Sequence, residues 1–276
     1  MQRSTPATPA SPVHAPTAPL PTYYGAEQQR GAWVLELFER TAADYERIEQ
    51  LMAFGSGSWY RRRALHSAGL RTGMRVIDVG TGTGLVAREA ARLVGPRGAV
   101  LGVDPSPAMM ANGDMAGVQL EVGRAESVPA PDAWADFLCM GYALRHISDL
   151  SVAFREFLRV LRPGGQLCLL EITRPHGRWQ RALLKTYMRV LVPWAARMLC
   201  RERDTPLLMR YYWDTIDACV APPLILGALE AAGFEQVSRR LELGIFSQYC
   251  ARRPVPILQQ PPAQVPQATM LSGSSP

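Results

Sequence analysis

A glycine-rich turn constrains this chain more strongly than any other feature of its sequence. Residues 75–79 read Arg-Val-Ile-Asp-Val, a run typical of a buried strand, and residues 80–84 follow as Gly-Thr-Gly-Thr-Gly. A helix is predicted directly afterwards, at 85–94. Glycines let the backbone approach a ligand that a Cβ would exclude. The turn therefore predicts a bound ligand, although a plain tight turn or a dinucleotide site fits the same residues.

Predicted strands and helices alternate over most of the remaining chain. We expect further strands at 99–103, 118–122, 136–140, 166–171, 235–241 and 245–252. We expect further helices at 32–51, 59–67, 109–112, 150–161 and 222–232. Strands that alternate with helices at this spacing form a parallel, doubly wound sheet. The fold class is therefore predicted as α/β and Rossmann-like, with a mostly parallel twisted sheet, helices on both faces and a helical insertion before the last strands.

Composition sets the domain boundaries. Residues 1–22 are rich in Pro, Ala and Thr, and residues 254–276 are rich in Pro, Gln and Ser. Neither segment offers enough apolar surface to offset the entropy of ordering, so both are predicted to be disordered tails. We expect residues 23–253 to form one domain, with residues 173–220 as a helical insertion or lid. Hydrophobic residues make up 47% of the chain, enough for one sizeable core.

The cysteines indicate a reducing compartment. Five of them are scattered along the chain without a Cys-x-x-Cys pair, so we expect neither disulfides nor a metal site. The N-terminus lacks the apolar region of a secretory signal, and no stretch is long and apolar enough to span a bilayer. These features favour a cytoplasmic protein.

Carboxylates at the predicted strand ends identify the ligand more closely. Asp104 ends the second predicted strand, about twenty residues beyond the turn, where a carboxylate pairs with two ribose hydroxyls. Asp104 could instead cap the next helix, and NAD carries a ribose as well. Asp78 precedes the glycines, near a cationic sulfonium or amino group, and Ala125 with Glu126 lies where an adenine edge is expected. Together they favour S-adenosylmethionine.

Three stretches resemble the UbiE-type C-methyltransferases of ubiquinone and menaquinone biosynthesis. Residues 125–129 read Ala-Glu-Ser-Val-Pro, residues 143–149 read Ala-Leu-Arg-His-Ile-Ser-Asp, and residues 159–165 read Arg-Val-Leu-Arg-Pro-Gly-Gly before Leu170 and Glu171. The second stretch is the more specific one. The resemblance implies a class I methyltransferase fold and S-adenosylmethionine as cofactor. It also implies C-methylation of a quinol-like or other small aromatic acceptor.

The resemblance assigns cofactor contacts to residues around the predicted strand ends. Together with the turn and the two carboxylates, the expected cofactor-binding residues are Asp78, Gly80, Gly82, Thr83, Asp104, Arg124, Ala125 and Gly141. The chain departs from the family at Arg124 and His146, where Asn is usual, and at Gly141, where Ser is usual. These departures bear on the acceptor more than on the cofactor.

Two basic residues are the candidate catalytic groups. The positive charge of Arg145 could stabilise a phenolate, which makes the neighbouring ring carbon nucleophilic. His146 could take the phenolic proton, because the pKa of histidine lies near neutrality. Arg145 could instead satisfy backbone carbonyls, and His146 could be structural.

The insertion combines positive charge with apolar surface. Its basic residues are Arg174, Arg178, Arg181, Lys185, Arg189, Arg197, Arg201 and Arg203. Its larger apolar residues include Trp179, Leu183, Tyr187, Val190, Leu191 and Trp194. A basic amphipathic helix of this kind lies on anionic membranes, covers an apolar substrate, or packs on the core with a solvated face. Residues 174–203 are therefore a candidate for peripheral contact with the cytoplasmic membrane face.

Other functions remain open on the sequence alone. The enzyme could transfer methyl groups to O, N or C of another small molecule, such as a secondary metabolite. An NAD-dependent oxidoreductase is disfavoured because no Tyr-x-x-x-Lys pair is present. The net charge of +6 permits nucleic-acid binding, but no such motif is visible and we expect none. A non-catalytic cofactor-binding protein and a homodimer are further alternatives.

Overall fold

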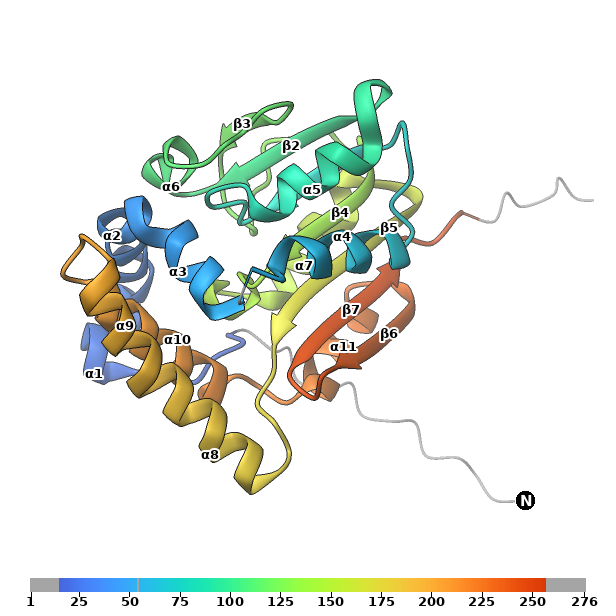
Figure 1. Ribbon diagram of the computed structural model, residues 1–276. Helices are drawn as coiled ribbons and strands as arrows, with labels where there is room; N and C mark the ends of the chain where they lie inside the picture. The colour runs from blue at the N-terminus through green and yellow to red at the C-terminus, as the bar shows by residue number, and fades with distance from the viewer. Residues whose placement is uncertain (1–14, 54, 257–276) are drawn as a thin grey trace, which may run out of the picture.

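A seven-stranded sheet forms the centre of the molecule (Figure 1). The computed structural model describes residues 15–53 and 55–256. The strands are β1 (Arg75–Val79), β2 (Ala99–Asp104), β3 (Gln119–Val122), β4 (Ala135–Gly141), β5 (Leu161–Ile172), β6 (Glu235–Glu242) and β7 (Phe246–Arg252). Their order is β3-β2-β1-β4-β5-β7-β6, and β7 is antiparallel to both of its neighbours, β5 and β6, whereas the other described pairs are parallel. The predicted doubly wound, Rossmann-like fold is confirmed.

Helices cover both faces of this sheet, and a further group of helices lies beside the carboxyl ends of its parallel strands (Figure 1). In the N-terminal half they are α1 (Pro21–Tyr24), η1 (Glu27–Gln29), α2 (Arg30–Thr41), η2 (Ala42–Asp44), α3 (Tyr45–Ala53), α4 (Gly57–Ser67), α5 (Leu85–Val94), η3 (Gly95–Arg97) and α6 (Pro107–Ala111). Beyond them lie η4 (Leu144–His146), α7 (Leu150–Val160), α8 (Arg178–Thr186), η5 (Tyr187–Leu191), α9 (Val192–Leu199), α10 (Thr205–Ala218) and α11 (Pro222–Ala231).

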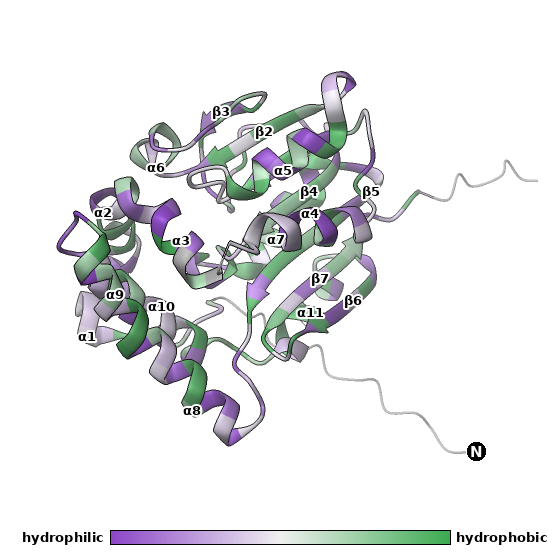
Figure 2. Cartoon of the chain, in the orientation of Figure 1, coloured by the Kyte–Doolittle hydropathy of each residue, from purple (hydrophilic) through white to green (hydrophobic). Residues whose placement is uncertain are grey.

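Two apolar layers lie on opposite faces of the sheet. Ile77 and Leu169 point toward α7 and α11, whereas Val76 and Cys168 point toward α4 and α5. This alternation follows from the two-residue repeat of a strand. The central strand β4 is accordingly hydrophobic along most of its length in Figure 2, whereas the outer strand β6 is largely hydrophilic. A third cluster joins α2 to α9 and α10 beside the carboxyl ends of the parallel strands.

The predicted helix 32–51 is two helices. The first helix ends at Thr41, whose Oγ1 donates to the Leu37 carbonyl at 2.8 Å. The chain then passes through η2 before α3 begins. The buried carboxylate of Asp44 accepts hydrogen bonds from the backbone N–H groups of Arg201 and Glu202, both at 2.7 Å. The break thus anchors the end of α9 to the N-terminal helices, a contact that helical periodicity does not reveal.

Residues 15–22 belong to the fold, which corrects the predicted disordered tail at residues 1–22. The Val220 N–H donates to the Pro16 carbonyl at 2.8 Å, and Thr17 forms an antiparallel bridge with Cys219. Thr17 Oγ1 also donates to the Arg145 carbonyl at 3.0 Å, and α1 begins at Pro21. Backbone pairing stabilises this segment together with the packing of Leu20 on the third apolar cluster, and composition does not report such pairing. Residues 1–14 and 257–276 of the predicted tails lie outside the described residues.

Four helical segments occupy the predicted insertion at residues 173–220. The segments α8, η5 and α9 follow one another without a gap, and η5 is a single π-helical turn ahead of Pro193. The segment α10 packs on α2 and α9 and buries Trp213 and Tyr211. Over the described part of the chain, no helix combines the length and apolar character needed to cross a membrane.

Candidate active site

The glycine turn joins β1 to α5 at the carboxyl edge of the sheet. Gly80, Gly82 and Gly84 all have positive φ, at 69°, 54° and 81°, which only glycine adopts without strain. A Cβ at Gly80 would lie 2.6 Å from the Ala143 Cβ. The turn is fixed to β2 because the N–H groups of Gly80 and Thr81 donate to the Val103 carbonyl. Its backbone is therefore held in a tight curve with no room for larger residues.

Asp104 ends β2 and faces this turn. Its carboxylate accepts the Gly82 N–H at 2.8 Å and the Ser106 N–H at 2.9 Å. Burial raises the pKa of Asp104, and these two N–H groups oppose that shift. A carboxylate has about four acceptor sites, so two remain for ribose hydroxyls. The helix-capping alternative does not hold, because Ser106 caps α6 by accepting the Met109 N–H.

Asp78 lies below the turn, fully enclosed at the end of β1. Thr81 Oγ1 donates to its carboxylate at 2.8 Å, and Cys139 Sγ lies 3.4 Å away. Burial raises the pKa of the Asp78 carboxyl to about 7, and these hydrogen bonds only partly oppose the shift. No cation pairs with Asp78 among the contacts of the described chain. A bound cation nearby would therefore change its charge state near neutral pH.

Thr83 and the segment after β3 form the other wall of this region. Thr83 Oγ1 is buried, and no partner for it exists among the described residues. Asp104 accepts the Gly123 N–H through its backbone carbonyl, which places Arg124 and the buried Ala125 beside it. The Arg124 side chain is exposed and its guanidinium approaches Gly31 of α2.

Glu126, beside the predicted adenine position, makes a contact that the sequence does not indicate. Its carboxylate accepts the backbone N–H groups of Ser148 and Asp149, at 2.8 and 3.4 Å. It therefore fixes the start of α7 to the segment that follows β3. The carboxylate still lies beside Ala125, at the predicted adenine position.

Gly141 at the end of β4 packs against α5. A Cβ at this position would lie 2.4 Å from the Val86 Cγ2, which explains why this chain has glycine where the family usually has serine. The next residue, Tyr142, has a φ of 61°, which is strained for a non-glycine residue. Strain of this kind occurs where the fold holds a loop in a functional geometry.

Arg145 is buried at the start of the next loop, with only 1% of its surface exposed. Its guanidinium pairs with Glu171 at the end of β5, and its Nε donates to Thr215 Oγ1 at 3.3 Å. It also lies over the Tyr212 ring, 5.7 Å from the centroid. The Arg145 carbonyl accepts from Thr17 and from Arg30. The pair leaves Glu171 Oε1 without a partner in the described chain.

His146 lies in an aromatic enclosure. Its ring stacks on Tyr211 at 5.7 Å and meets the edge of Phe38 at 5.3 Å. Both ring nitrogens are buried, with no hydrogen-bond partner among the described residues. Burial and the charges of Arg145 and Arg30 hold the pKa of His146 well below its usual range. This shift disfavours the imidazolium form of His146 and moves its pKa away from the near-neutral value expected for the residue type.

Tyr45 connects the two halves of the site. Its hydroxyl lies 2.8 Å from that of Tyr212, and its ring packs on Phe38. Burial raises the pKa of Tyr45, and the charges of both Asp104 and Arg145 act on it. Tyr45 therefore lies between the predicted cofactor residues and the predicted acceptor residues.

Several residues of this enclosure escape a reading of sequence motifs. Only Glu171 has a local signal, because it is a carboxylate at the end of the predicted strand 166–171, where ligands of such sheets bind. Thr215, Tyr212 and Arg30 come from helices far away in the chain, and nothing local marks them.

Comparison with known proteins identifies the family. The family model described as the ubiE/COQ5 methyltransferase family matches residues 24–252. The chain belongs to the ubiE/COQ5 methyltransferase family. It is 31% identical over 220 residues to the ubiquinone/menaquinone biosynthesis C-methyltransferase UbiE of Stutzerimonas stutzeri, covering 77% of this chain and 85% of that protein. The UbiE protein of Vibrio cholerae is 30% identical over 213 residues, covering 74% and 81%.

Solved structures agree on the fold. A SAM-dependent methyltransferase from Aquifex aeolicus superposes with a TM-score of 0.55 at 20% identity, covering 75% of this chain and 97% of that one. Phosphoethanolamine N-methyltransferase 2 from Haemonchus contortus, in complex with S-adenosyl-L-methionine, gives a TM-score of 0.52 at 17% identity, covering 71% and 52%. The chain is a methyltransferase that uses S-adenosylmethionine, as the sequence predicted.

The residues at the carboxyl edge fit this cofactor. The turn at Gly80 and Gly82 has no Cβ atoms that would keep a ligand from the backbone, and Asp104 has acceptor sites that the chain does not use. Thr83 Oγ1 has no hydrogen-bond partner among the described residues. The eight predicted cofactor residues gather at this edge, on β1, β2 and β4 or in the segments that follow β1 and β3, although the contact of each with cofactor stays a prediction.

The raised pKa of Asp78 predicts pH-dependent cofactor binding. The carboxylate attracts the cationic cofactor only when ionised, so affinity should rise as the pH increases through about 7. We expect calorimetry to show severalfold tighter binding at about pH 8 than at about pH 6. Asp78→Asn should bind more weakly and lose this dependence.

S-Adenosylhomocysteine, which lacks the sulfonium charge, is the matched ligand control. A dependence shared by both ligands would assign the effect to the amino group, and equal wild-type affinity at both pH values would contradict the role of Asp78.

Proposed function

We propose that this enzyme transfers a methyl group to a ring carbon of a quinol-like aromatic acceptor. The observation that carries the proposal is the enclosure of Phe38, Tyr45, Tyr212 and His146 beside the Arg145–Glu171 pair. Aromatic side chains can pack on a flat ring, and the unpaired polar atoms of His146 and Glu171 beside them can bond ring hydroxyls. The similar UbiE proteins carry the name of ubiquinone/menaquinone biosynthesis C-methyltransferases.

The chemistry divides between alignment and charge. S-Adenosylmethionine supplies an electrophilic methyl group whose leaving sulfur is already cationic. The enclosure holds the acceptor ring in line, which removes much of the entropic cost of the reaction. The positive charge of Arg145 stabilises the phenolate form, which raises electron density at the adjacent ring carbon. Glu171 fixes the guanidinium in place and prevents it from moving toward solvent.

His146 acts as a hydrogen-bond acceptor in this scheme. Burial and the neighbouring positive charges lower its pKa, so the scheme uses the neutral ring, in which one nitrogen keeps its N–H and the other accepts. Its unpaired nitrogens can each accept from or donate to one ring hydroxyl, which orients the acceptor. The free Glu171 Oε1 is a second acceptor for a hydroxyl proton.

An assay with purified enzyme tests the acceptor class. Demethylated hydroquinones with a short prenyl tail should be methylated, and NMR of the product should show the new methyl on a ring carbon. A catechol serves as the comparison acceptor for O-methylation. Methylation confined to the catechol oxygen would favour the alternative, a methyltransferase of other small molecules.

Removal of the buried charge pair should reduce turnover. Arg145→Ala alone would leave an unpaired buried carboxylate and destabilise the fold by about 3–5 kcal/mol. The double variant Arg145→Gln with Glu171→Gln avoids that charge. We expect kcat to fall by roughly 10²-fold, the usual loss for one electrostatic stabiliser. Cofactor affinity and thermal midpoint report whether the fold is intact; near-normal kcat in the folded double variant would refute the role of Arg145.

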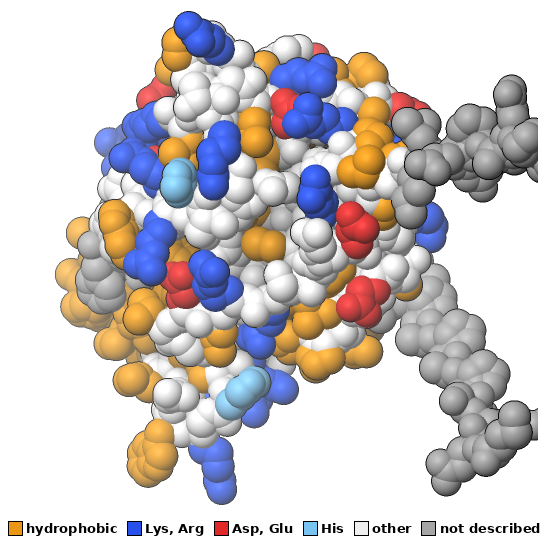
Figure 3. Space-filling view, turned by 90° about the vertical axis from the view of Figure 1, so that its right-hand side faces the viewer, with side chains coloured by type: hydrophobic (Ala, Val, Ile, Leu, Met, Phe, Trp, Pro, Cys, Tyr) orange, Lys and Arg blue, Asp and Glu red, His pale blue; other side chains and the backbone are white. Residues whose placement is uncertain are grey.

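The proposal places the enzyme in the cytoplasm, at the membrane surface. Along α8, η5 and α9 large apolar side chains face outward: Trp179 is 89% exposed, Leu183 74% and Trp194 63%. Leu191 and Met198 extend the same surface. In the space-filling view, hydrophobic side chains gather along the lower left of the molecule, at the height of α8 (Figure 3). An exposed stripe of this size marks an interaction surface.

Positive charge lies beside this stripe. Arg178, Lys185 and Arg197 are on the same helical segments, and none of them forms an ion pair among the described residues. Basic groups next to exposed tryptophan fit an anionic bilayer surface, where rings enter the headgroup region and cations meet phosphate. A lipid quinol lies in the same bilayer.

Vesicle binding tests this surface. The wild-type protein should co-sediment with vesicles of anionic phospholipid at low salt, and the double variant Trp179→Ser with Trp194→Ser should lose most of the binding. The matched control Trp59→Ser removes an equally large exposed ring outside the insertion. Absence of wild-type binding, or dimers that disappear in the double variant, would show that lipid is not the partner.

A further inference from the structure

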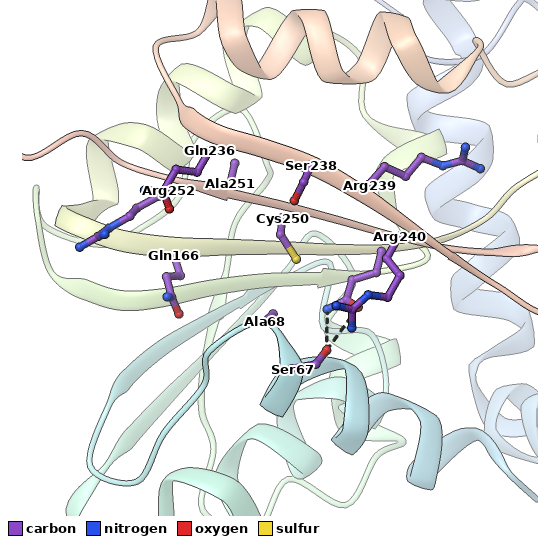
Figure 4. Close-up of a pocket in the computed structure, with 11 residues that line it drawn as sticks. Ser67, Ala68, Gln166, Gln236, Ser238, Arg239, Arg240, Cys250, Ala251 and Arg252 are labelled. Atoms are coloured by element: carbon purple, nitrogen blue, oxygen red, sulfur yellow. Dashed lines mark hydrogen bonds between the residues drawn. The ribbon is translucent and has the colours of Figure 1, made fainter.

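A polar hollow of about 400 Å³ lies away from the active site, between the end of α4 and the edge of the sheet. Strands β5, β7 and β6 supply most of its wall, as Figure 4 shows. Its lining residues include Ser67, Ser238, Arg240, Cys250 and Arg252. All the charged residues that line it are basic. The hollow therefore favours a small anionic ligand.

Cys250 lies at the base of this hollow, directly opposite Cys168 on the neighbouring strand. The two residues are register partners in the antiparallel pair of β5 and β7. Hydrogen-bonded and non-hydrogen-bonded pairs alternate along an antiparallel ladder. The Thr173 N–H donates to the Ile245 carbonyl and the Arg253 N–H donates to the Gly165 carbonyl, so the pairs 173/245 and 165/253 are bonded. Counting from either pair in steps of two makes Cys168 and Cys250 a non-hydrogen-bonded pair. At such pairs the Cα atoms are about 4.5 Å apart and the side chains approach each other. This separation lies within the range that a disulfide spans.

The two thiols differ in their surroundings. Cys250 is partly exposed, and its neighbours in the hollow include Arg240. Cys168 and the nearby Arg240 charge lower the pKa of Cys250. The hydrogen bond with Cys250 and burial both raise the pKa of Cys168. Cys168 also accepts a hydrogen bond from Gln248 Nε2 at 3.7 Å. Cys250 is therefore the nucleophile that ligands reach, and Cys168 is the thiol behind it.

We propose that Cys250 is a thiol-modification site for a small anionic disulfide, and that Cys168 resolves the adduct into a cross-strand disulfide. The Cys250 thiolate attacks one sulfur of the ligand, and the other half leaves as a thiolate. The Cys168 thiol then gives its proton to a released thiolate and attacks the Cys250 sulfur, which expels the second half. Two protein thiols are oxidised and one ligand disulfide is reduced.

The basic residues select the ligand by its charge. Arg240 and Arg252 extend along the wall on either side of Cys250 in Figure 4. Carboxylates of the ligand would pair with these guanidinium groups while its sulfur meets the thiolate. Ser67 and Ser238 add hydrogen-bonding groups. The proposal rests on this hollow alone and is independent of the methyl acceptor.

Oxidised glutathione is the probe, and peptide mass spectrometry after alkylation gives the result. In the full-length wild-type protein we expect a bond between Cys168 and Cys250. In Cys168→Ser we expect a stable glutathione adduct on Cys250, and in Cys250→Ser neither product. The partly exposed Cys200 and Cys219 serve as internal controls, because they do not line the hollow. Arg240→Ala should slow adduct formation by roughly threefold, since the thiolate fraction falls.

The outcomes separate the proposal from ordinary thiol oxidation. Cystamine, a cationic disulfide, should react more slowly than oxidised glutathione, and the difference should disappear in Arg240→Ala with Arg252→Ala. Equal labelling of Cys200, Cys219 and Cys250 would overturn the site. A Cys168→Ser protein without an adduct on Cys250 would overturn it as well.

Discussion

The hydrogen bond between the Gly82 N–H and the Asp104 carboxylate holds together the region on which the enzyme depends. It can form only because the turn after β1 adopts positive φ at three glycines, which brings the backbone to the end of β2. The same carboxylate accepts the Ser106 N–H and keeps two acceptor sites for a ligand. One buried group thus joins the turn to the start of α6 and is the predicted ribose-binding group.

A second buried charge organises the acceptor side. Arg145 pairs with Glu171, contacts Thr215 of α10 and offers its carbonyl to Thr17 and Arg30. Breaking such a pair is costly, because one charge stays buried without its partner. The N-terminal segment, the insertion and the sheet are therefore fixed to each other around Arg145, at the proposed acceptor site. Burial here, together with the charges of Arg145 and Arg30, lowers the pKa of His146, which disfavours the imidazolium form.

The insertion adds a surface that the core does not need. Segment α10 buries its large residues against α2 and α9, whereas α8 has no buried residue among those described. Apolar side chains on α8 and α9 consequently remain exposed beside basic ones. A large exposed apolar surface lowers the solubility of a protein, and in natural proteins it marks a site of interaction with a partner or a membrane. Substrate access and lipid contact would then depend on the same helices.

The sequence alone determined the fold and the cofactor edge. Strand periodicity, the Gly-Thr-Gly-Thr-Gly turn and an acidic residue at the next strand end are local patterns, and parallel strands bring their carboxyl ends together by geometry. Tertiary structure decided the rest. The partner of Arg145, the pKa of His146, the order of residues 15–22 and the pairing of Cys168 with Cys250 join segments far apart in the chain. Burial and charge at such contacts depend on neighbours that no local pattern contains.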